Sequence, residues 1–170
     1  GGGLCAGMAA FIKLVRPEVK VIAVESDESA CLKEAMVHQR PTRLNFVGKF
    51  ADGVAVGEIG QETFRILKES VDEVITATND EICFAIKDIF EETRSIAEPS
   101  GALALAGLRK YAKQNDANGQ TFVTVLSGAN SNFSTLNYVT ERTSMLREQE
   151  AKSEVDSGVE HVMLNNTSTT

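Results

Sequence analysis

Three consecutive glycines, Gly1 to Gly3, lead directly into an apolar stretch with helical spacing. Glycine lets the backbone approach an anion closely, and the free N–H groups at a helix N-terminus attract negative charge. The pattern therefore predicts a phosphate-binding turn. Gly1, Gly3 and Ala6 also satisfy G-x-G-x-x-G/A, and Glu25 stands 22 residues after Gly3, where a dinucleotide-binding fold needs an acid for a ribose hydroxyl. That fingerprint requires a strand before the glycines, which this sequence does not contain, so a glycine turn without a ligand is the alternative.

Two further polar motifs stand where chemistry is expected. Glu98 opens the sequence EPSGA, whose proline and serine suit the first turn of a helix. Ser127 opens the sequence SGAN directly after an apolar run, the place at which ligands bind on parallel sheets. Both motifs have a structural alternative, namely an exposed acid before a helix and a serine that satisfies the backbone of a turn.

The composition limits the class of protein. The chain has 170 residues, of which 42% are hydrophobic and 24% charged, and this indicates a globular fold with a sizeable core. The net charge of −7 and the scattered basic residues exclude nucleic acid as a partner, since its binding needs clustered Lys and Arg. No apolar run approaches the roughly 18 to 20 residues that span a bilayer, so we expect no membrane partner.

The cysteines and histidines indicate neither a disulfide framework nor a metal centre. The three cysteines are odd in number and widely spaced, which favours buried reduced thiols and a cytoplasmic-type compartment: Cys5, Cys31 and Cys83. The two histidines, His38 and His161, lie far apart, and no Cys/His spacing resembles a zinc site.

Strand-like and helix-like segments alternate along the chain. We expect strands over residues 19–24, 73–77 and 121–126, and helices over 4–15, 29–37, 59–67, 101–111 and 133–142, with a further helix that starts in a capping box at Thr78. This alternation predicts an α/β fold, a partial parallel sheet with helices on both faces. Residues 1–150 then form one domain, and residues 151–170 form a polar tail or linker.

The motifs in this order resemble a known family. GGGL, CAG, VIAVE, FADGVAV, ETF, EPSGALALAG and LSGAN look like the second half of the catalytic domain of biosynthetic threonine dehydratases (threonine ammonia-lyases), from Gly1 to about Glu150. These enzymes are tryptophan-synthase-β-like, fold type II pyridoxal-phosphate enzymes. GGGL and SGAN recur in related serine dehydratases and racemases, whereas FADGVAV and EPSGALALAG narrow the match to threonine dehydratases.

The resemblance implies roles for the three motifs. Gly1, Gly2, Gly3 and Leu4 would belong to the loop whose amides bind the phosphate of pyridoxal 5′-phosphate, and Ser127 would hydrogen-bond its pyridine nitrogen. Glu98 would lie near the cofactor ring. A neutral hydroxyl at the nitrogen, unlike a carboxylate, suits β-elimination. The implied reaction is the dehydration and deamination of L-threonine, or L-serine, to a 2-oxo acid and ammonia, and 2-oxobutanoate from threonine enters isoleucine synthesis.

The resemblance also implies what lies outside this sequence. In the family the Schiff-base lysine and an asparagine-bearing substrate loop lie upstream, and none of the lysines here stands in the matching motif, so no catalytic residue is assigned. The phosphate loop usually has four glycines, so we expect the chain to begin inside it and to need the N-terminal half of the same enzyme. We therefore expect a fragment that is inactive alone, and a cytoplasmic or organellar homo-oligomer when complete.

One family feature is not expected here. Related racemases bind a divalent cation through a glutamate, a backbone carbonyl and an aspartate. Glu25 matches the glutamate, but Cys31 stands at the aspartate position, so the resemblance predicts no metal site.

Two other functions compete with an enzyme fragment. A non-catalytic nucleotide-binding or regulatory module would use the glycine turn but leave EPSGA and SGAN unexplained. A degenerate homologue would bind a partner through the exposed half of its sheet.

Overall fold

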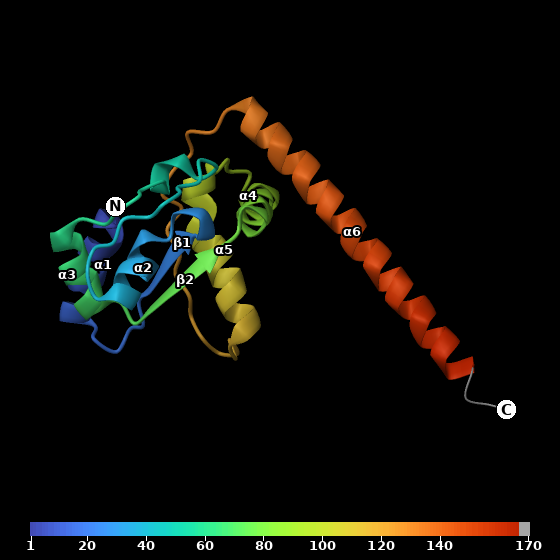
Figure 1. Cartoon of the computed structure of the whole chain (residues 1–170), viewed down its shortest axis with the longest axis horizontal. Coiled ribbons are helices and arrows are strands. Elements are labelled where there is room, and N and C mark those ends of the chain that lie inside the picture. The colour runs from blue at the N-terminus through green and yellow to red at the C-terminus, as the bar shows by residue number, and fades with distance from the viewer. Residues whose placement is uncertain (167–170) are drawn as a thin grey trace. The chain divides into compact units, whose positions relative to one another are not determined.

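The computed structural model describes residues 1–166, with the side chains of residues 1–152 (Figure 1). The chain divides into two compact units, Gly1–Ser131 and a second unit that begins at Asn132. The predicted division near residue 150 stays a prediction. No helix among the described residues is long and apolar enough to cross a membrane.

The first unit is built on a two-stranded parallel sheet. Strand β1 (Ile22–Ser26) pairs with β2 (Glu73–Ala77), with Ile22 opposite Glu73 and Ser26 opposite Ala77. Three helices pack on one face of this sheet: α1 (Gly3–Val15), α2 (Cys31–His38) and α3 (Gln61–Ser70). Helix α5 (Pro99–Gln114) covers the other face, and α4 (Asn79–Thr93) packs against α5. The predicted α/β fold with helices on both faces is confirmed.

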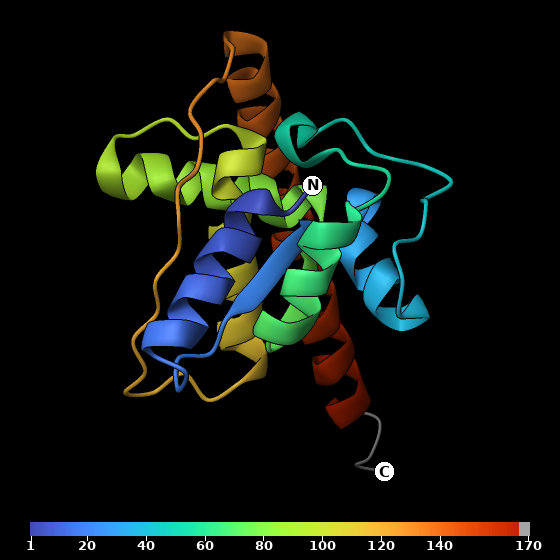
Figure 2. The ribbon, with the colours of Figure 1, turned by 90° about the vertical axis from the view of Figure 1, so that its left-hand side faces the viewer.

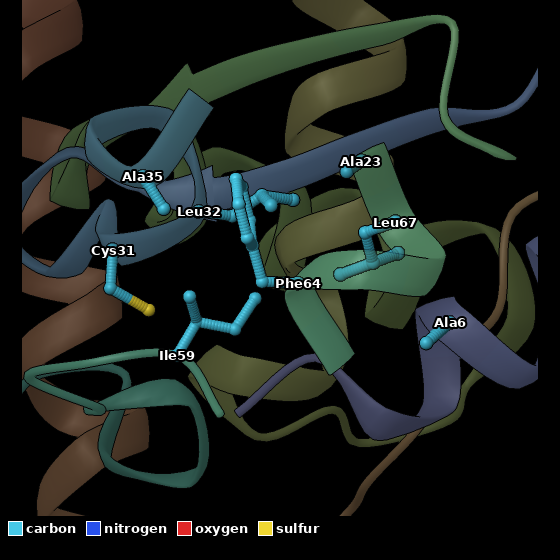
Figure 3. Packing of buried hydrophobic residues seen from close by; sticks show 8 residues of the cluster. All are labelled: Ala6, Ala23, Cys31, Leu32, Ala35, Ile59, Phe64 and Leu67. Atoms are coloured by element: carbon cyan, nitrogen blue, oxygen red, sulfur yellow. The ribbon is translucent and has the colours of Figure 1, made fainter. Parts of the chain in front are cut away.

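The core lies between β1 and the first three helices (Figure 3). Leu67 of α3 is fully buried there beside Phe64, and Ala23 of β1 closes the same cluster. The next residue, Val24, faces α5, where a side chain at Gly107 would strike it. Successive side chains of a strand point to opposite faces, so this short apolar strand supplies both cores.

The start of α4 is fixed by the predicted capping box. The Thr78 hydroxyl accepts the N–H of Glu81 at 3.2 Å, and the Glu81 carboxylate accepts the N–H of Thr78 at 2.8 Å. Two otherwise unpaired backbone donors are thereby satisfied. The capping box also fixes the end of β2, because Thr78 directly follows that strand.

The third predicted strand is not formed. Residues 121–126 run without helix or strand structure, and no neighbouring strand pairs with them in the described part of the chain. Val123 leaves 86% of its surface exposed. The apolar run has strand composition, but a strand also needs a partner for its backbone N–H and C=O groups, and composition does not supply one.

The second unit consists mainly of one helix, α6 (Phe133–Asn166). The side chain of Asn132 accepts the N–H of Thr135 at 2.8 Å, which caps the first turn. We predicted an end near Arg142, and the helix continues well beyond it. The assignment of residues 151–170 as a tail or linker stays a prediction, and residues 167–170 lie outside the described residues.

Candidate functional site

The glycine turn presents an open helix N-terminus. Gly2 adopts φ 77°, a left-handed conformation that disfavours any other residue, and no described side chain caps α1 there. The first helical hydrogen bond runs from the N–H of Ala6 to the carbonyl of Gly2, at 2.8 Å. The amides of Gly3, Leu4 and Cys5 come before that bond in the first turn. Such amides can bind an anion.

The inner side of the same turn is tightly packed. A Cβ on Gly2 would lie 3.0 Å from Leu67 Cδ1 and 3.2 Å from Thr63 Cγ2. Helix α3 therefore packs directly against the turn. A Cβ on Gly1 or Gly3 would meet nothing within 4 Å. The turn is therefore rigidly backed by the core and open on the outside, which is the arrangement that a bound phosphate needs.

The carboxylate of Glu25 is hydrogen-bonded within the protein. Its two carboxylate oxygens accept the backbone N–H groups of Leu32 and Lys33, each at 2.8 Å, which ties the end of β1 to the start of α2. Burial raises the pKa of Glu25, although these two N–H groups offset part of that rise. The predicted ribose contact requires an available acid, and both oxygens of Glu25 are already engaged. The structure therefore disfavours the dinucleotide interpretation.

Cys31 faces the same carboxylate. Burial, followed by the negative charge of Glu25, raises the pKa of the Cys31 thiol to about 11. The residue is thus a buried neutral thiol. Within residues 1–152, no group of three or more His, Cys, Asp and Glu side chains could hold a metal ion.

The structure brings together the EPSGA and SGAN motifs, which are separated in sequence. The N–H of Glu98 donates to the carbonyl of Gly128 at 3.1 Å, and the N–H of Asn130 donates to Glu98 Oε2 at 3.0 Å. The hydroxyl of Ser131 donates to the carbonyl of Ala97 at 3.1 Å. The Ser127 loop, defined here as residues 127–131, is thereby bonded to the two residues that directly precede α5.

A third segment completes this end of the first unit. The short helix η2 (Asp52–Val54) belongs to the FADGVAV motif and packs on α5. A Cβ on Gly53 would lie 2.8 Å from the hydroxyl of Ser100, which is buried and has no hydrogen-bond partner among the described residues. Sequence reasoning did not single out Gly53, Ser100 or Asn130 as site residues, although all three lie inside the motifs that carried the resemblance.

These segments share one edge of the sheet. Figure 2 shows the N-terminus beside the end of β1 and near the first turn of α5, and Figure 1 shows the same segments at the same end of the first unit. In parallel sheets this carboxyl edge is where ligands bind. Ser127 is exposed there, and Glu98 is half-buried.

The comparison with known families decides the classification. Residues 1–128 match the family described as "Pyridoxal-phosphate dependent enzyme". The chain belongs to this family. It is 57% identical over 151 residues to "L-threonine dehydratase biosynthetic IlvA" of Pasteurella multocida and 52% identical to the protein of the same name from Escherichia coli. In both cases the match covers 89% of this chain but 29% of the relative, so the chain spans under a third of their length.

A solved structure shows the same fold. The processed form of threonine deaminase isoform 2 from Solanum lycopersicum superposes with a TM-score of 0.81 at 40% identity. The superposition covers 83% of this chain and 41% of that chain. The predicted membership of the fold type II pyridoxal-phosphate enzymes is therefore confirmed.

The residues at this edge fit the family's cofactor. The uncapped amides of α1 match the phosphate, whose two negative charges a helix N-terminus stabilises. The exposed hydroxyl of Ser127 can hydrogen-bond a ring nitrogen. The predicted contact of Glu98 with the ring stays a prediction. One of its carboxylate oxygens already accepts the N–H of Asn130.

Proposed function

We propose that this chain forms part of a threonine dehydratase that converts L-threonine, or L-serine, to a 2-oxo acid and ammonia. The observation that carries the proposal is the pairing, at one edge of the sheet, of an uncapped glycine turn with a serine loop. The 57% identity to a biosynthetic threonine dehydratase supports it. With threonine the product is 2-oxobutanoate, which places the enzyme in isoleucine synthesis.

Pyridoxal phosphate supplies, when bound, an electron-withdrawing ring that makes proton loss at Cα and departure of the β-hydroxyl feasible. The chain's own residues bind and orient that group. The amides of Gly3, Leu4 and Cys5 hold the phosphate, and Gly1 and Gly2 shape the turn around it. Ser127 orients the ring through its nitrogen without adding a negative charge. The site therefore favours elimination over reactions that need a long-lived carbanion.

The other parts of the reaction lie with the rest of the enzyme. No lysine of this chain is proposed as the cofactor's covalent partner, and we propose that the N-terminal half of the same enzyme supplies it. The complete enzyme is proposed to be a homo-oligomer of the cytoplasm or of an organelle. The alternative of a nucleotide-binding regulatory module is weakened because α2 already engages both oxygens of Glu25.

Pyridoxine 5′-phosphate tests the cofactor site in the chain as it stands. This compound retains the phosphate and the ring nitrogen but has no aldehyde, so it does not react with surface lysines. Titration of the ¹⁵N-labelled chain should shift the amide signals of residues 3–5 and 127–130. Gly3→Asp should abolish the shifts, because a carboxylate at the helix N-terminus repels the phosphate while it stabilises α1.

A matched variant controls for charge alone. Ala10→Asp adds the same charge to the exposed surface of α1, two turns further along, and should bind almost as tightly as the parent chain. An equal loss of binding in both variants, or no shift in the parent chain, would refute the assignment of the glycine turn as the phosphate site. A separate assay addresses activity: the chain with pyridoxal phosphate and L-threonine should release no 2-oxobutanoate unless the N-terminal half is added. Release by the chain alone would contradict the assignment of the lysine.

A further inference from the structure

We infer that Glu98 is a positioning residue for Ser127: its contact with the Ser127 loop sets where the Ser127 hydroxyl meets the cofactor nitrogen. This inference rests on the proposed function, in which Ser127 makes that contact. It assigns to Glu98 a task other than the ring contact that the resemblance implies.

Glu98 makes two hydrogen bonds to the Ser127 loop, one at Gly128 and one at Asn130. Its backbone N–H donates to the carbonyl of Gly128, directly after Ser127, and its carboxylate accepts the N–H of Asn130 two residues further on. Both the main chain and the side chain of one residue therefore hold the same loop. A hydrogen bond from an N–H to a carboxylate is stronger than one between neutral groups.

The loop packs this closely against Glu98 and α5 only because Gly128 and Gly101 have no side chains. A Cβ on Gly128 would strike the Oε1 atom of Glu98, and a Cβ on Gly101 would strike the backbone of Gly128. The carboxylate is thus in close contact with the loop, and the loop is in close contact with the first turn of α5. Such close approach fixes the position of the backbone and not merely its hydrogen bonding.

The loop has little other support in the described part of the chain. Residues 121–126, which lead into Ser127, pair with no strand there, and Ser127 itself is exposed. The bonded residues Gly128, Asn130 and Ser131 all follow Ser127 and all bond to the segment 97–98. Loss of the carboxylate should therefore loosen the loop between Gly128 and Ser131, whose two other bonds remain, while the glycine turn, on α1, keeps its structure.

Hydrogen exchange of the ligand-free chain tests the inference without any cofactor. In Glu98→Ala the amide of Asn130 should exchange at least about tenfold faster, and in Glu98→Gln, which keeps an acceptor oxygen, the rate should return most of the way. Glu92→Ala, at an exposed acid of α4, is the matched control and should leave that rate unchanged. An unchanged Asn130 rate in folded Glu98→Ala would overturn the inference.

Ligand binding supplies the second readout. With pyridoxine 5′-phosphate, Glu98→Ala should keep the shifts of residues 3–5, lose those of residues 127–130, and bind about tenfold more weakly. Glu98→Gln should restore both shifts and affinity. Gly128→Ala should reproduce the alanine phenotype with Glu98 intact, which keeps the test decisive if Glu98→Ala fails to fold. Retention of the loop shifts in folded Glu98→Ala or Gly128→Ala would overturn the inference, whereas absence of all shifts in the parent chain would refute the proposed function instead.

Discussion

The glycine turn and the Ser127 loop lie at the same edge of the sheet but are built in opposite ways. The glycine turn keeps the amides of its first helical turn free of any side-chain cap and is open on its outer side. In the Ser127 loop, three polar groups are engaged: the carbonyl of Gly128, the N–H of Asn130 and the hydroxyl of Ser131 all bond to the segment that precedes α5. One region offers hydrogen-bond donors, and the other uses its own to stay in place.

The difference follows from what each region would bind. A phosphate takes several hydrogen bonds at once, so the turn must present several free N–H groups, and the helix dipole adds to their attraction. A ring nitrogen takes one hydrogen bond, whose strength depends on direction. The residues around Ser127 are therefore best used to aim a single hydroxyl. The resemblance placed Glu98 near the cofactor ring, whereas we propose that it serves that purpose.

The largest effect is expected from Gly101→Ala, which should disrupt the Ser127 loop and leave the glycine turn intact. The new Cβ would strike the backbone of Gly128, which cannot move aside as a flexible side chain does. Overpacking of this kind costs about 1–3 kcal/mol of unfolding free energy. Urea unfolding measures it, and the shifts of residues 127–130 with pyridoxine 5′-phosphate should vanish while those of residues 3–5 remain.

Gly7→Ala is the control for that substitution. Gly7 lies inside α1 in open space, so alanine should raise the unfolding free energy, by up to about 1 kcal/mol. If Gly101→Ala proved as harmless as Gly7→Ala, the close contact between α5 and the Ser127 loop would be wrong.

Gly2→Ala is the converse experiment, because it strains the glycine turn and leaves the Ser127 loop intact. The left-handed conformation at φ 77° costs a residue with a Cβ roughly 1–2 kcal/mol. Leu67 and Thr63 leave the methyl group little room. Thermal unfolding should show the loss, and phosphate affinity should fall. Gly2→Ala with parental stability and affinity would mean that the turn needs neither its backbone conformation nor its support from α3.

The smallest effect is expected at the opposite end of the strands, at an ion pair outside the proposed cofactor site. The Lys13 ammonium, 2.6 Å from Asp72, and the N–H of Val21 hold the pKa of Asp72 below its ordinary value of 3.8. A lowered carboxyl pKa contributes stability that is present above the unfolded value and is lost as pH falls through the folded value. Asp72→Asn should therefore lower the unfolding free energy slightly at pH 7.

Measurements of both chains across pH give the check on Asp72. The difference between Asp72→Asn and the parent should shrink as pH falls below 3.8, and binding of pyridoxine 5′-phosphate should be equal in the two chains at pH 7. A difference in stability that did not depend on pH would show that the ion pair is not its source.

Local patterns in the sequence predicted local structure well. The strand at residues 73–77 and the capping box of Thr78 and Glu81 were found because their determinants lie within a few residues of one another. The strand over 121–126 was predicted wrongly, since its formation depends on a neighbour that no local pattern reveals.

The hydrogen-bond partners of Glu98 and Glu25 could not be predicted from the sequence either. Glu98 and Asn130 are 32 residues apart, and only the folded chain shows that they meet. Glu25 stands at the spacing of a ribose-binding acid, and nothing in that spacing tells that the amides of α2 engage it. The sequence motifs come together at one edge of the sheet, whereas the contacts of its acids are visible only in the folded chain.

The central claim is that two regions of this chain bind opposite ends of one cofactor. The most direct test maps amide shifts in the ¹⁵N-labelled chain with two ligands in turn, inorganic phosphate and pyridoxine 5′-phosphate. We expect phosphate to shift residues 3–5 alone, and pyridoxine 5′-phosphate to shift residues 3–5 and 127–130 together. A response of residues 127–130 to phosphate alone, or none to pyridoxine 5′-phosphate, would contradict the claim.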